Sequence, residues 1–264
     1  MTTALTIAGS DSGGGAGIQA DLKTFAALGV FGTSALTAIT AQNTTGVFGV
    51  EMVPVSLVVA QIEAVLDDLG ADAIKIGMLG TAAVVEAVAS VLATRRVAPL
   101  VVDPVMIAKS RHRLLDEDAV AAMTRHLLPL ASVVTPNAPE AEALTGRPVR
   151  TEAEARDAAR RLHDFGPRAV IVKGGHLETD DVVDVLFDGH AFVEARGPRH
   201  ATRHTHGTGC TFAAAIAAHL ALGHDLPAAF RSSRDYLDGA IRHAPGLGRG
   251  AGPVDHFLRD RAES

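Results

Sequence analysis

Short apolar runs alternate with amphipathic stretches along most of the chain. Two short strands, near Val182–Phe187 and Ala191–Ala195, can form a hairpin through Asp188–Gly189. The other apolar runs that predict strands are Leu5–Ala8, Ser34–Thr40, Ala73–Ile76, Leu100–Val102, Ser132–Val134 and Ala169–Val172. Helical spacing predicts helices over Ile18–Leu28, Val55–Leu69, Thr81 to about Thr94, Glu117–Leu128, a short segment from Asn137, Thr151–Phe165, and from Thr208 and about Leu226. This alternation predicts right-handed crossovers and a parallel sheet covered by helices on both faces.

Polar side chains mark the ends of the predicted helices and strands. Ser56, Thr81, Asn137 and Thr151 are predicted N-caps, and Thr151 forms a capping box with the glutamate three residues later. Polar groups also follow the strands, at Gly9–Asp11, Gln42–Asn43, Lys75–Gly77, Asp103, Asn137–Glu140 and Lys173–Gly175. Ligands of parallel α/β sheets bind at the carboxyl ends of the strands, so this placement favours a function, although a cap or a turn explains each cluster alone.

Cys210 is the only cysteine, and it stands in the segment His204–Thr211 at the start of a helix of small residues. Gly207 and Gly209 allow backbone N–H groups to converge on an anion, and the helix N-terminus adds partial positive charge. The same dipole favours a thiolate, which predicts an anion hole beside a base or nucleophile. A small buried residue at a tight turn is the alternative, and the segment alone does not decide between them.

The glycine-rich segment Ser10–Gly17 invites a nucleotide-binding interpretation. It is not a Walker A loop, because no Lys-Ser/Thr pair follows the glycines. Gly15–Ala20 fits the dinucleotide fingerprint in its G-x-G-x-x-A form, but no acidic residue ends a second strand about 20 residues later. The glycines therefore indicate a close approach of backbone to a small substrate, with Asp21 on the next helical turn.

Asp103 and Glu140 are carboxylates placed where two predicted strands give way to the next element. Mg²⁺ prefers oxygen ligands and keeps several waters, so this pair suits a magnesium–nucleotide complex. Lys173, ahead of two glycines, can reach a phosphate. The alternatives are a favourable helix-dipole position for Glu140 and a solvated lysine at a strand exit for Lys173.

Composition narrows the function classes. The 264 residues suffice for one large α/β domain, and no linker or composition break divides them. A net charge of −6 disfavours a nucleic-acid partner, and no apolar run predicts a membrane span. The first residues carry no basic region or cleavage site, so we expect a cytoplasmic protein without disulfides. His204 and His206 lack the further Cys/His cluster that a zinc site needs.

Taken together, the motifs resemble the hydroxymethylpyrimidine/phosphomethylpyrimidine kinases of thiamine biosynthesis, within the ribokinase-like superfamily. The resemblance runs nearly end to end, and the ordered set is more specific than any one fragment. Its pieces are Ala8–Asp21, Thr37–Thr44, Lys75–Leu79, Val102–Met106, Thr135–Asn137 with Glu140, Val172–His176 and His206–Thr211.

The resemblance implies a single ribokinase-like kinase domain over residues 1–264, a three-layer α/β/α fold with a central, mostly parallel sheet. It also implies two ATP-dependent transfers with Mg²⁺: phosphorylation of 4-amino-5-hydroxymethyl-2-methylpyrimidine, and conversion of the monophosphate to the diphosphate. A homodimer is expected on the same ground. By carry-over, the implied site residues are Gly9, Asp21, Gln42, Met78 and Val105 for the pyrimidine, Lys173, Asn137 and Thr208 for the nucleotide, and Asp103 and Glu140 for the metal.

The last glycine-rich motif of most ribokinase-like enzymes ends in an aspartate, the catalytic base, and Cys210 holds that place here, as in the pyrimidine kinases. The resemblance thus assigns Cys210 as the base, framed by Gly207 and Gly209. One departure from the family pattern is Lys109–Arg113, where two arginines follow Ser110; it leaves the balance of the two steps open. A pyridoxal or pyridoxine kinase of the same superfamily and a catalytically silent pyrimidine-binding regulator remain as alternatives.

Overall fold

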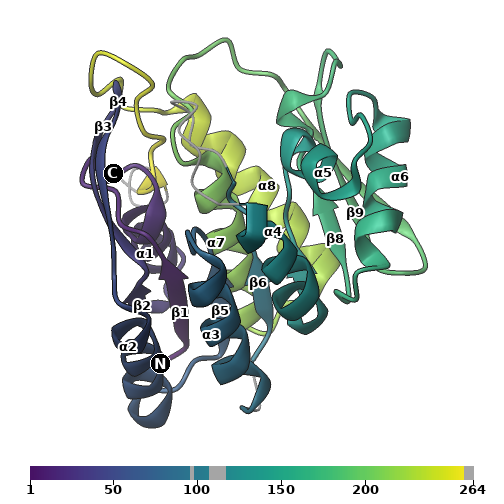
Figure 1. The fold of residues 1–264 in the computed structure, drawn as a ribbon. Coiled ribbons are helices and arrows are strands. Elements are labelled where there is room, and N and C mark those ends of the chain that lie inside the picture. Colours follow the sequence, from purple (N-terminus) through teal and green to yellow (C-terminus); the bar gives the residue numbers. More distant parts are fainter. Residues whose placement is uncertain (96–97, 107–116, 259–264) are drawn as a thin grey trace.

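A computed structural model describes residues 1–95, 98–106 and 117–258, and its centre is an eight-stranded sheet (Figure 1). The strands stand in the order β10–β9–β8–β7–β6–β5–β1–β2. From β2 to β8 all neighbours are parallel, whereas β9 is antiparallel to both β8 and β10. The strands are β1 (Thr3–Ala8), β2 (Phe31–Leu36), β5 (Ala73–Ile76), β6 (Leu100–Val102), β7 (Val133–Val134), β8 (Val170–Val172), β9 (Val182–Phe187) and β10 (Phe192–Gly197).

Helices cover both faces of this sheet. Helices α1, α7 and α8 pack together on one face, and α2, α3, α4, α5 and α6 cover the other (Figure 1). The sheet is therefore the middle of three layers, and it is mostly parallel, as the alternation of elements predicted. The helices are α1 (Gly17–Ala27), α2 (Val55–Asp68), α3 (Ala82–Ala93), α4 (Glu117–Ala122), α5 (Ala138–Thr145), α6 (Glu152–His163), α7 (Thr208–Ala221) and α8 (Leu226–Arg242).

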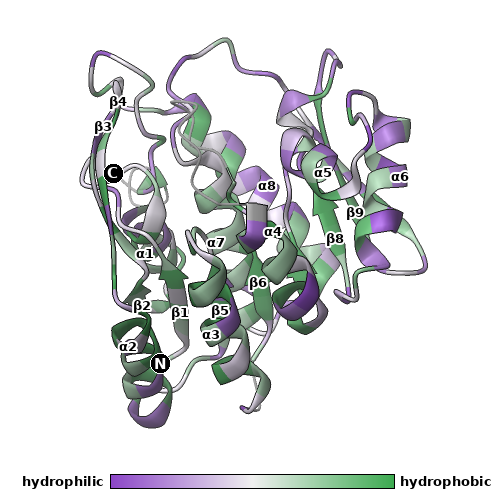
Figure 2. Ribbon diagram, viewed as in Figure 1, coloured by the Kyte–Doolittle hydropathy of each residue, from purple (hydrophilic) through white to green (hydrophobic). Residues whose placement is uncertain are grey.

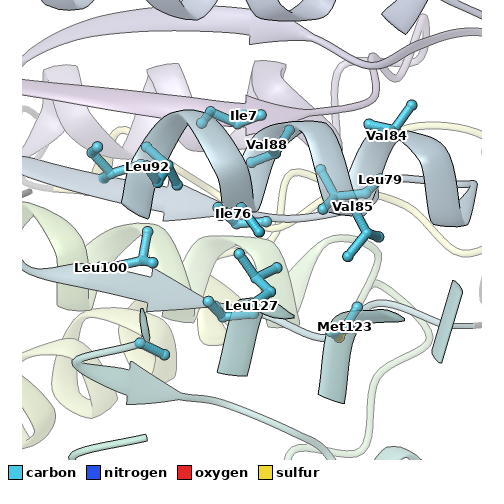
Figure 3. Close-up of a cluster of buried hydrophobic side chains, with 14 of the residues drawn as sticks. Ile7, Ile76, Leu79, Val84, Val85, Val88, Leu92, Leu100, Met123 and Leu127 are labelled. Atoms are coloured by element: carbon cyan, nitrogen blue, oxygen red, sulfur yellow. The ribbon is translucent and has the colours of Figure 1, made fainter. Parts of the chain in front are cut away.

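The buried side chains divide according to the faces of the sheet. In β6, Leu100 and Val102 join the cluster beneath α2, α3 and α4, and Val101 joins the cluster beneath α1 and α7, since successive strand residues point to opposite faces. The first of these clusters is shown in Figure 3, and Figure 2 shows apolar strands inside more polar helix surfaces. Burial on both faces explains why these strands are continuous apolar runs.

The segment Ser34–Thr40, predicted as one strand, is two. Strand β2 ends at Leu36, and Thr37 leaves the main sheet while its hydroxyl donates to the Met78 carbonyl oxygen at 2.6 Å. Strand β3 (Ala38–Asn43) then pairs with β4 (Gly46–Met52) as a separate antiparallel sheet. The sequence analysis missed β4, whose apolar Phe48 is exposed rather than buried. This two-stranded sheet carries Gln42 to the carboxyl end of the main sheet.

Most predicted helix starts are confirmed. Thr81 caps α3, Asn137 caps α5, and Thr151 forms the predicted capping box on α6. Ser56 is wrong as a cap, because α2 begins at Val55 after Pro54 without any side-chain cap. The helix predicted over Glu117–Leu128 is α4 followed by a π-helical turn over Met123–Leu127. The β9–β10 hairpin turns at Asp188–Gly189, as predicted.

None of the helices in the described ranges has the length and apolar character needed to cross a bilayer. The Lys109–Arg113 segment, where the sequence departs from the family pattern, lies outside the described residues.

The two candidate caps make a matched stability test. Thr151→Ala removes a side chain that accepts from the Glu154 N–H at 3.3 Å, so we expect the free energy of unfolding to fall by about 1 kcal/mol. Ser56→Ala, at an exposed position inside α2, should leave it unchanged. Urea denaturation of both variants measures this, and an equal loss for Ser56→Ala would contradict the observed start of α2.

Candidate active site

Two adjoining pockets open at the carboxyl end of the main sheet. The first, the cysteine pocket, contains Cys210 and is walled by the loop after β1, strand β3 and the start of α7. The second, the arginine pocket, contains Arg199 and Arg234. The residues common to both pockets are Lys173, Thr208 and Gly209. Of the site residues predicted from sequence, those lining the cysteine pocket are Gly9, Gln42, Met78, Asp103, Val105, Glu140, Lys173 and Gly207–Cys210, and Asn137 lines the arginine pocket.

The glycine-rich loop after β1 is filled by its own aspartate. Asp11 Oδ1 accepts from Gly13 N at 2.8 Å, and Asp11 Oδ2 accepts from Gly15 N at 3.0 Å and Ala16 N at 2.8 Å. These are the N–H groups that a phosphate-binding loop presents to its ligand. Because the Asp11 carboxylate already occupies them, the loop shapes a pocket wall rather than binding a phosphate.

Asp11 also connects the loop after β1 to a segment far along the chain. Its Oδ2 lies 2.8 Å from Nε2 of His206, a residue 195 positions later. Burial alone would raise the pKa of Asp11, but the hydrogen bond and charge of His206, with the N–H groups of the loop, hold this pKa below its ordinary value. Both residues lie within motifs recognised in the sequence, but no role in the site was predicted for either. His206, with His204, was considered only as a zinc ligand.

The wall of the cysteine pocket combines one amide with apolar side chains. Gln42 is half-buried, with its amide nitrogen 3.3 Å from His206 Nε2. Met78 and Val105 line the pocket as expected for apolar walls. A Cβ at Gly9 would lie 3.3 Å from the Met78 sulfur, so glycine keeps this wall open for a ligand.

Asp21 lies beneath the pocket, not on its wall. Its carboxylate is fully buried, 2.8 Å from Lys75 Nζ and 2.6 Å from the Thr6 hydroxyl that donates to it. This placement corrects the expectation that Asp21 faces the substrate: the residue that reaches the cavity is its partner, Lys75. Burial alone would lower the pKa of Lys75, but the adjacent Asp21 carboxylate raises it, so the ammonium stays charged.

Cys210 stands on the first turn of α7, facing the cysteine pocket. Burial raises the pKa of the Cys210 thiol to about 11; the charge of Lys75 opposes this rise, and the carboxylates of Asp21 and Asp103 add to it. In the unliganded protein, burial and the neighbouring carboxylates thus oppose the thiolate that the helix dipole favours. Desolvation and the carboxylates of Asp21 and Asp103 outweigh the dipole of α7, although Cys210 stands on the first turn, where the dipole acts most strongly.

Backbone geometry at the start of α7 requires its glycines. Gly207 has a φ of 78°, and a Cβ there would overlap the carbonyl oxygen of Gly15. A Cβ at Gly209 would lie 3.2 Å from Lys173 Nζ and 3.5 Å from Asp103 Oδ2. Gly207 thus allows two loops to touch, and Gly209 leaves room around the charged groups. The first-turn N–H groups of α7 have no acceptor within the helix and can face an anion.

Lys173 connects the two pockets electrostatically. Its Nζ lies 2.6 Å from Asp103 Oδ1 and 3.9 Å from Glu140 Oε2. Burial, opposed by Lys173 and reinforced by Asp103, raises the pKa of Glu140 to about 7. Two buried carboxylates therefore share one ammonium. Glu140 also takes the position on the first turn of a helix that was the alternative to metal binding. Its Oε2 accepts from Asn137 N at 2.7 Å in the capping box of α5.

The arginine pocket holds a further buried ion pair, which was not predicted from the sequence. Asp184 Oδ1 accepts from Gly174 N at 2.6 Å, and its Oδ2 lies 3.6 Å from Arg234 Nε. Burial raises the pKa of Asp184, and Arg234 opposes the rise. The pair fixes the turn that follows Lys173. No motif joins these residues in the sequence, because β9 and α8 bring them together only in the fold.

Comparison with known proteins places this architecture among ribokinase-like kinases. A *Staphylococcus aureus* pyridoxal kinase, solved in complex with AMP-PCP and pyridoxal, has a TM-score of 0.91 at 38% identity over 99% of this chain and 95% of its own. A *Clostridium difficile* phosphomethylpyrimidine kinase has a TM-score of 0.82 at 42% identity over 91% of this chain and 100% of its own.

Sequence comparison narrows this class. Residues 11–255 match the family described as phosphomethylpyrimidine kinase. A *Haemophilus influenzae* hydroxymethylpyrimidine/phosphomethylpyrimidine kinase is 50% identical over 97% of each chain. The thiamine biosynthesis bifunctional protein ThiED of *Geobacter sulfurreducens* is 54% identical over 96% of this chain, which spans about half (52%) of that protein. The chain belongs to the phosphomethylpyrimidine kinase family.

The state of the thiol can be measured directly, because Cys210 is the sole cysteine. We expect the rate of alkylation of the native protein to rise with pH toward an inflection near 11, since only the thiolate reacts. The same chain in denaturant should show an ordinary inflection near about 8.5. Because the thiol of the unfolded chain ionises at a lower pH than the native thiol, the free energy of unfolding should fall as the pH rises from about 8.5 toward 11. A native inflection below 8 would restore the activated thiolate.

Proposed function

We propose that this protein uses ATP to phosphorylate 4-amino-5-hydroxymethyl-2-methylpyrimidine, and then its monophosphate to the diphosphate, as a single kinase domain in thiamine biosynthesis. The observation that carries the proposal is the junction of the two pockets. Lys173 lines both pockets at this junction, and Cys210 lines the cysteine pocket at the start of α7. One wall of the cysteine pocket combines an amide with apolar groups, and the arginine pocket is rich in cationic groups. Family membership supports the reaction type.

The nucleotide belongs in the arginine pocket and the pyrimidine in the cysteine pocket. Asn137, Thr208 and Lys173 then face the phosphates, and Lys173 neutralises charge as the phosphoryl group passes between the pockets. Gly9, Gln42, Met78 and Val105 surround the pyrimidine. The arrangement brings the acceptor hydroxyl to the N-terminus of α7.

Asp103 and Glu140 fit a magnesium ion bound together with phosphates. Mg²⁺ is usually held by one or two carboxylates, with waters and phosphate oxygens completing its shell. Two buried carboxylates that share the single charge of Lys173 leave negative charge uncompensated, which a divalent cation would balance. When bound, the ion would neutralise charge on the transferring phosphate. Charge neutralisation by Lys173 remains the contribution of the chain itself.

Cys210 receives the hydroxyl proton in the first transfer. Only the thiolate can accept that proton, and a pKa of about 11 keeps the thiol mostly protonated at neutral pH, so positioning of the hydroxyl carries a larger share of catalysis than an ionised base does. Phosphoryl transfer tolerates this, since its loose transition state asks mainly for alignment and charge neutralisation. The second transfer needs less from Cys210, because its nucleophile is already an ionised phosphate.

A pyridoxal kinase is the second candidate. Its support is the match of the whole fold to pyridoxal kinases, with TM-scores of 0.91 at 37% and 38% identity. Both substrate classes are small hydroxymethyl heteroaromatics, so the wall of the cysteine pocket must separate them. A homodimer in the cytoplasm completes the proposal, and it rests on the family resemblance alone.

Side-by-side turnover with the hydroxymethylpyrimidine, its monophosphate and pyridoxal, each with ATP and Mg²⁺, tests the proposal. We expect both pyrimidines to be phosphorylated and pyridoxal to be a weaker substrate. Turnover of pyridoxal but of neither pyrimidine would establish the second candidate. If ATP is not consumed with any of the three compounds, both candidates are overturned. Size-exclusion chromatography with light scattering tests the dimer.

Replacing Cys210 should separate the two transfers. We expect Cys210→Ala to lose ~10²–10⁴-fold in phosphorylation of the alcohol, the usual scale for a proton acceptor, and much less with the monophosphate. Cys210→Asp should recover part of the first activity. Single-turnover rates with each substrate provide the measurement. Small, equal effects on both steps would reduce Cys210 to a packing residue.

Replacing either proposed metal ligand should raise the requirement for Mg²⁺. We expect Asp103→Asn and Glu140→Gln to increase the Mg²⁺ concentration for half-maximal turnover by about 10- to 100-fold, a scale that even outer-shell residues reach. Asp157→Asn, the same change on the surface of α6, is the matched control. An unchanged Mg²⁺ requirement with a lowered melting temperature would assign both carboxylates to the fold.

A further inference from the structure

A continuous chain of polar contacts runs along the wall of the cysteine pocket. Asp11 Oδ2 lies 2.8 Å from His206 Nε2, and Gln42 Nε2 lies 3.3 Å from the same His206 nitrogen. At the far side of the amide, Gln42 Oε1 lies 3.4 Å from Thr40 Oγ1, which lies 2.9 Å from the Ser10 carbonyl oxygen. The chain joins three separate segments: the loop after β1, strand β3 and the residues before α7.

The Asp11 end of this chain determines where one hydrogen must be. An ionised carboxylate only accepts hydrogen bonds, so His206 Nε2 must carry a hydrogen and donate it to Asp11. The nitrogen of the Gln42 amide is also only a donor. Two donors then face each other at 3.3 Å, whereas an amide oxygen at the same place would be the second acceptor of the one Nε2–H, in a three-centre hydrogen bond shared with Asp11.

The Thr40 end leads independently to the same orientation. A hydroxyl has one hydrogen, and Thr40 directs it to the Ser10 carbonyl oxygen, which can only accept. Thr40 Oγ1 can therefore only accept from Gln42, which requires an N–H and not an oxygen at that position. A half-turn of the Gln42 amide satisfies both ends, with Oε1 toward His206 and the NH₂ group toward Thr40.

We propose that Asp11 and His206 are specificity-determining positioning residues, which hold the Gln42 amide in this one orientation. The outer edge of the amide then offers an oxygen lone pair and an N–H in a fixed order. An aminopyrimidine matches that order, because its exocyclic amine donates to the oxygen and its ring nitrogen accepts from the N–H. The 4-oxo ring presents a carbonyl oxygen and a ring N–H in the reverse order. The proposal rests on the proposed function and explains how the site rejects oxo-pyrimidines, which a freely turning amide would accept.

The His206 ring is itself held by close packing. Its backbone N–H donates to the Gly252 carbonyl oxygen at 3.0 Å, and a Cβ at Gly15 would lie 2.7 Å from His206 Cδ2. Gly15→Ala therefore displaces the ring without removing any hydrogen-bonding group. It provides a variant that acts on the position of His206 rather than on its chemistry.

The test is the ratio of kcat/KM for the 4-amino and 4-oxo forms of the hydroxymethylpyrimidine, a ratio that does not depend on the fraction of active enzyme. We expect the unaltered protein to prefer the amino form by about 5- to 150-fold, the scale of one mismatched buried hydrogen-bond pair. His206→Phe should bring the ratio within a few-fold of one, largely by gain of the oxo form. His206→Gln should retain the preference, because its amide N–H groups can serve both Asp11 and Gln42, and Gly15→Ala should weaken it.

A double-mutant cycle shows whether His206 acts through Gln42. In a Gln42→Leu background, His206→Phe should leave the amino-to-oxo ratio unchanged, since no amide remains to be oriented. An equal change of ratio in both backgrounds, or full selectivity in His206→Phe, would overturn the inference while turnover of the aminopyrimidine still supports the proposed function. If the unaltered protein phosphorylates neither ring, the proposed function fails and this assignment fails with it.

Discussion

The carboxyl edge of the sheet depends on one constraint, that a buried carboxylate needs a cation or a set of N–H donors beside it. Isolated charge in the interior costs several kcal/mol, so each acidic residue at this edge is paired. Every pair joins elements far apart in the sequence. The pairs are Asp21 with Lys75, Asp103 with Lys173, Asp11 with His206, and Asp184 with Arg234.

These pairs differ in how completely the charge of the carboxylates is balanced. A balanced pair serves the fold, whereas an unbalanced group is a candidate for binding a ligand. Asp21 and Lys75 are fully buried and neutral as a pair, so they form a floor. Lys173 faces two carboxylates, and Glu140 accordingly has a pKa raised to about 7 by burial and by Asp103. Uncompensated charge at a pocket edge is unfavourable for the fold alone. Such a position is where a cation-bearing ligand gains most from binding.

The sequence predicted the parts of the molecule that local patterns determine. Apolar runs such as Leu100–Val102 identify strands because both of their faces are buried, and the capping box at Thr151 identifies a helix start because its partners are three residues apart. Strand β4 escaped prediction, since it pairs only with β3 outside the main sheet and exposes its Phe48. Ser56 failed as a cap because proline ahead of Val55 already set the start of α2.

The candidate site was predictable as a set of motifs but not as a set of contacts. Eleven of the expected site residues line the cysteine pocket: ten follow strands or open helices at one edge of the main sheet, and Gln42 lies in β3 beside that edge. The pKa values of the site residues could not be predicted from the sequence in the same way. The thiol pKa of Cys210 rises because desolvation and the carboxylates of Asp21 and Asp103 act together, and these two neighbours come from parts of the chain far from Cys210.

The high pKa of Cys210 also bears on why a thiol can stand where related kinases carry an aspartate. A carboxylate there would add a further negative charge near Asp21 and Asp103, with Lys75 and Lys173 to oppose it. A neutral thiol avoids that repulsion, and its thiolate form, a small fraction at neutral pH, is the form that can accept a proton from a hydroxyl. The high pKa slows phosphorylation of the alcohol, which needs a proton acceptor. It has less effect on phosphorylation of the monophosphate, whose nucleophile is already ionised. A site that serves both acceptors is thus better matched by a weakly acidic, neutral side chain than by a permanent anion.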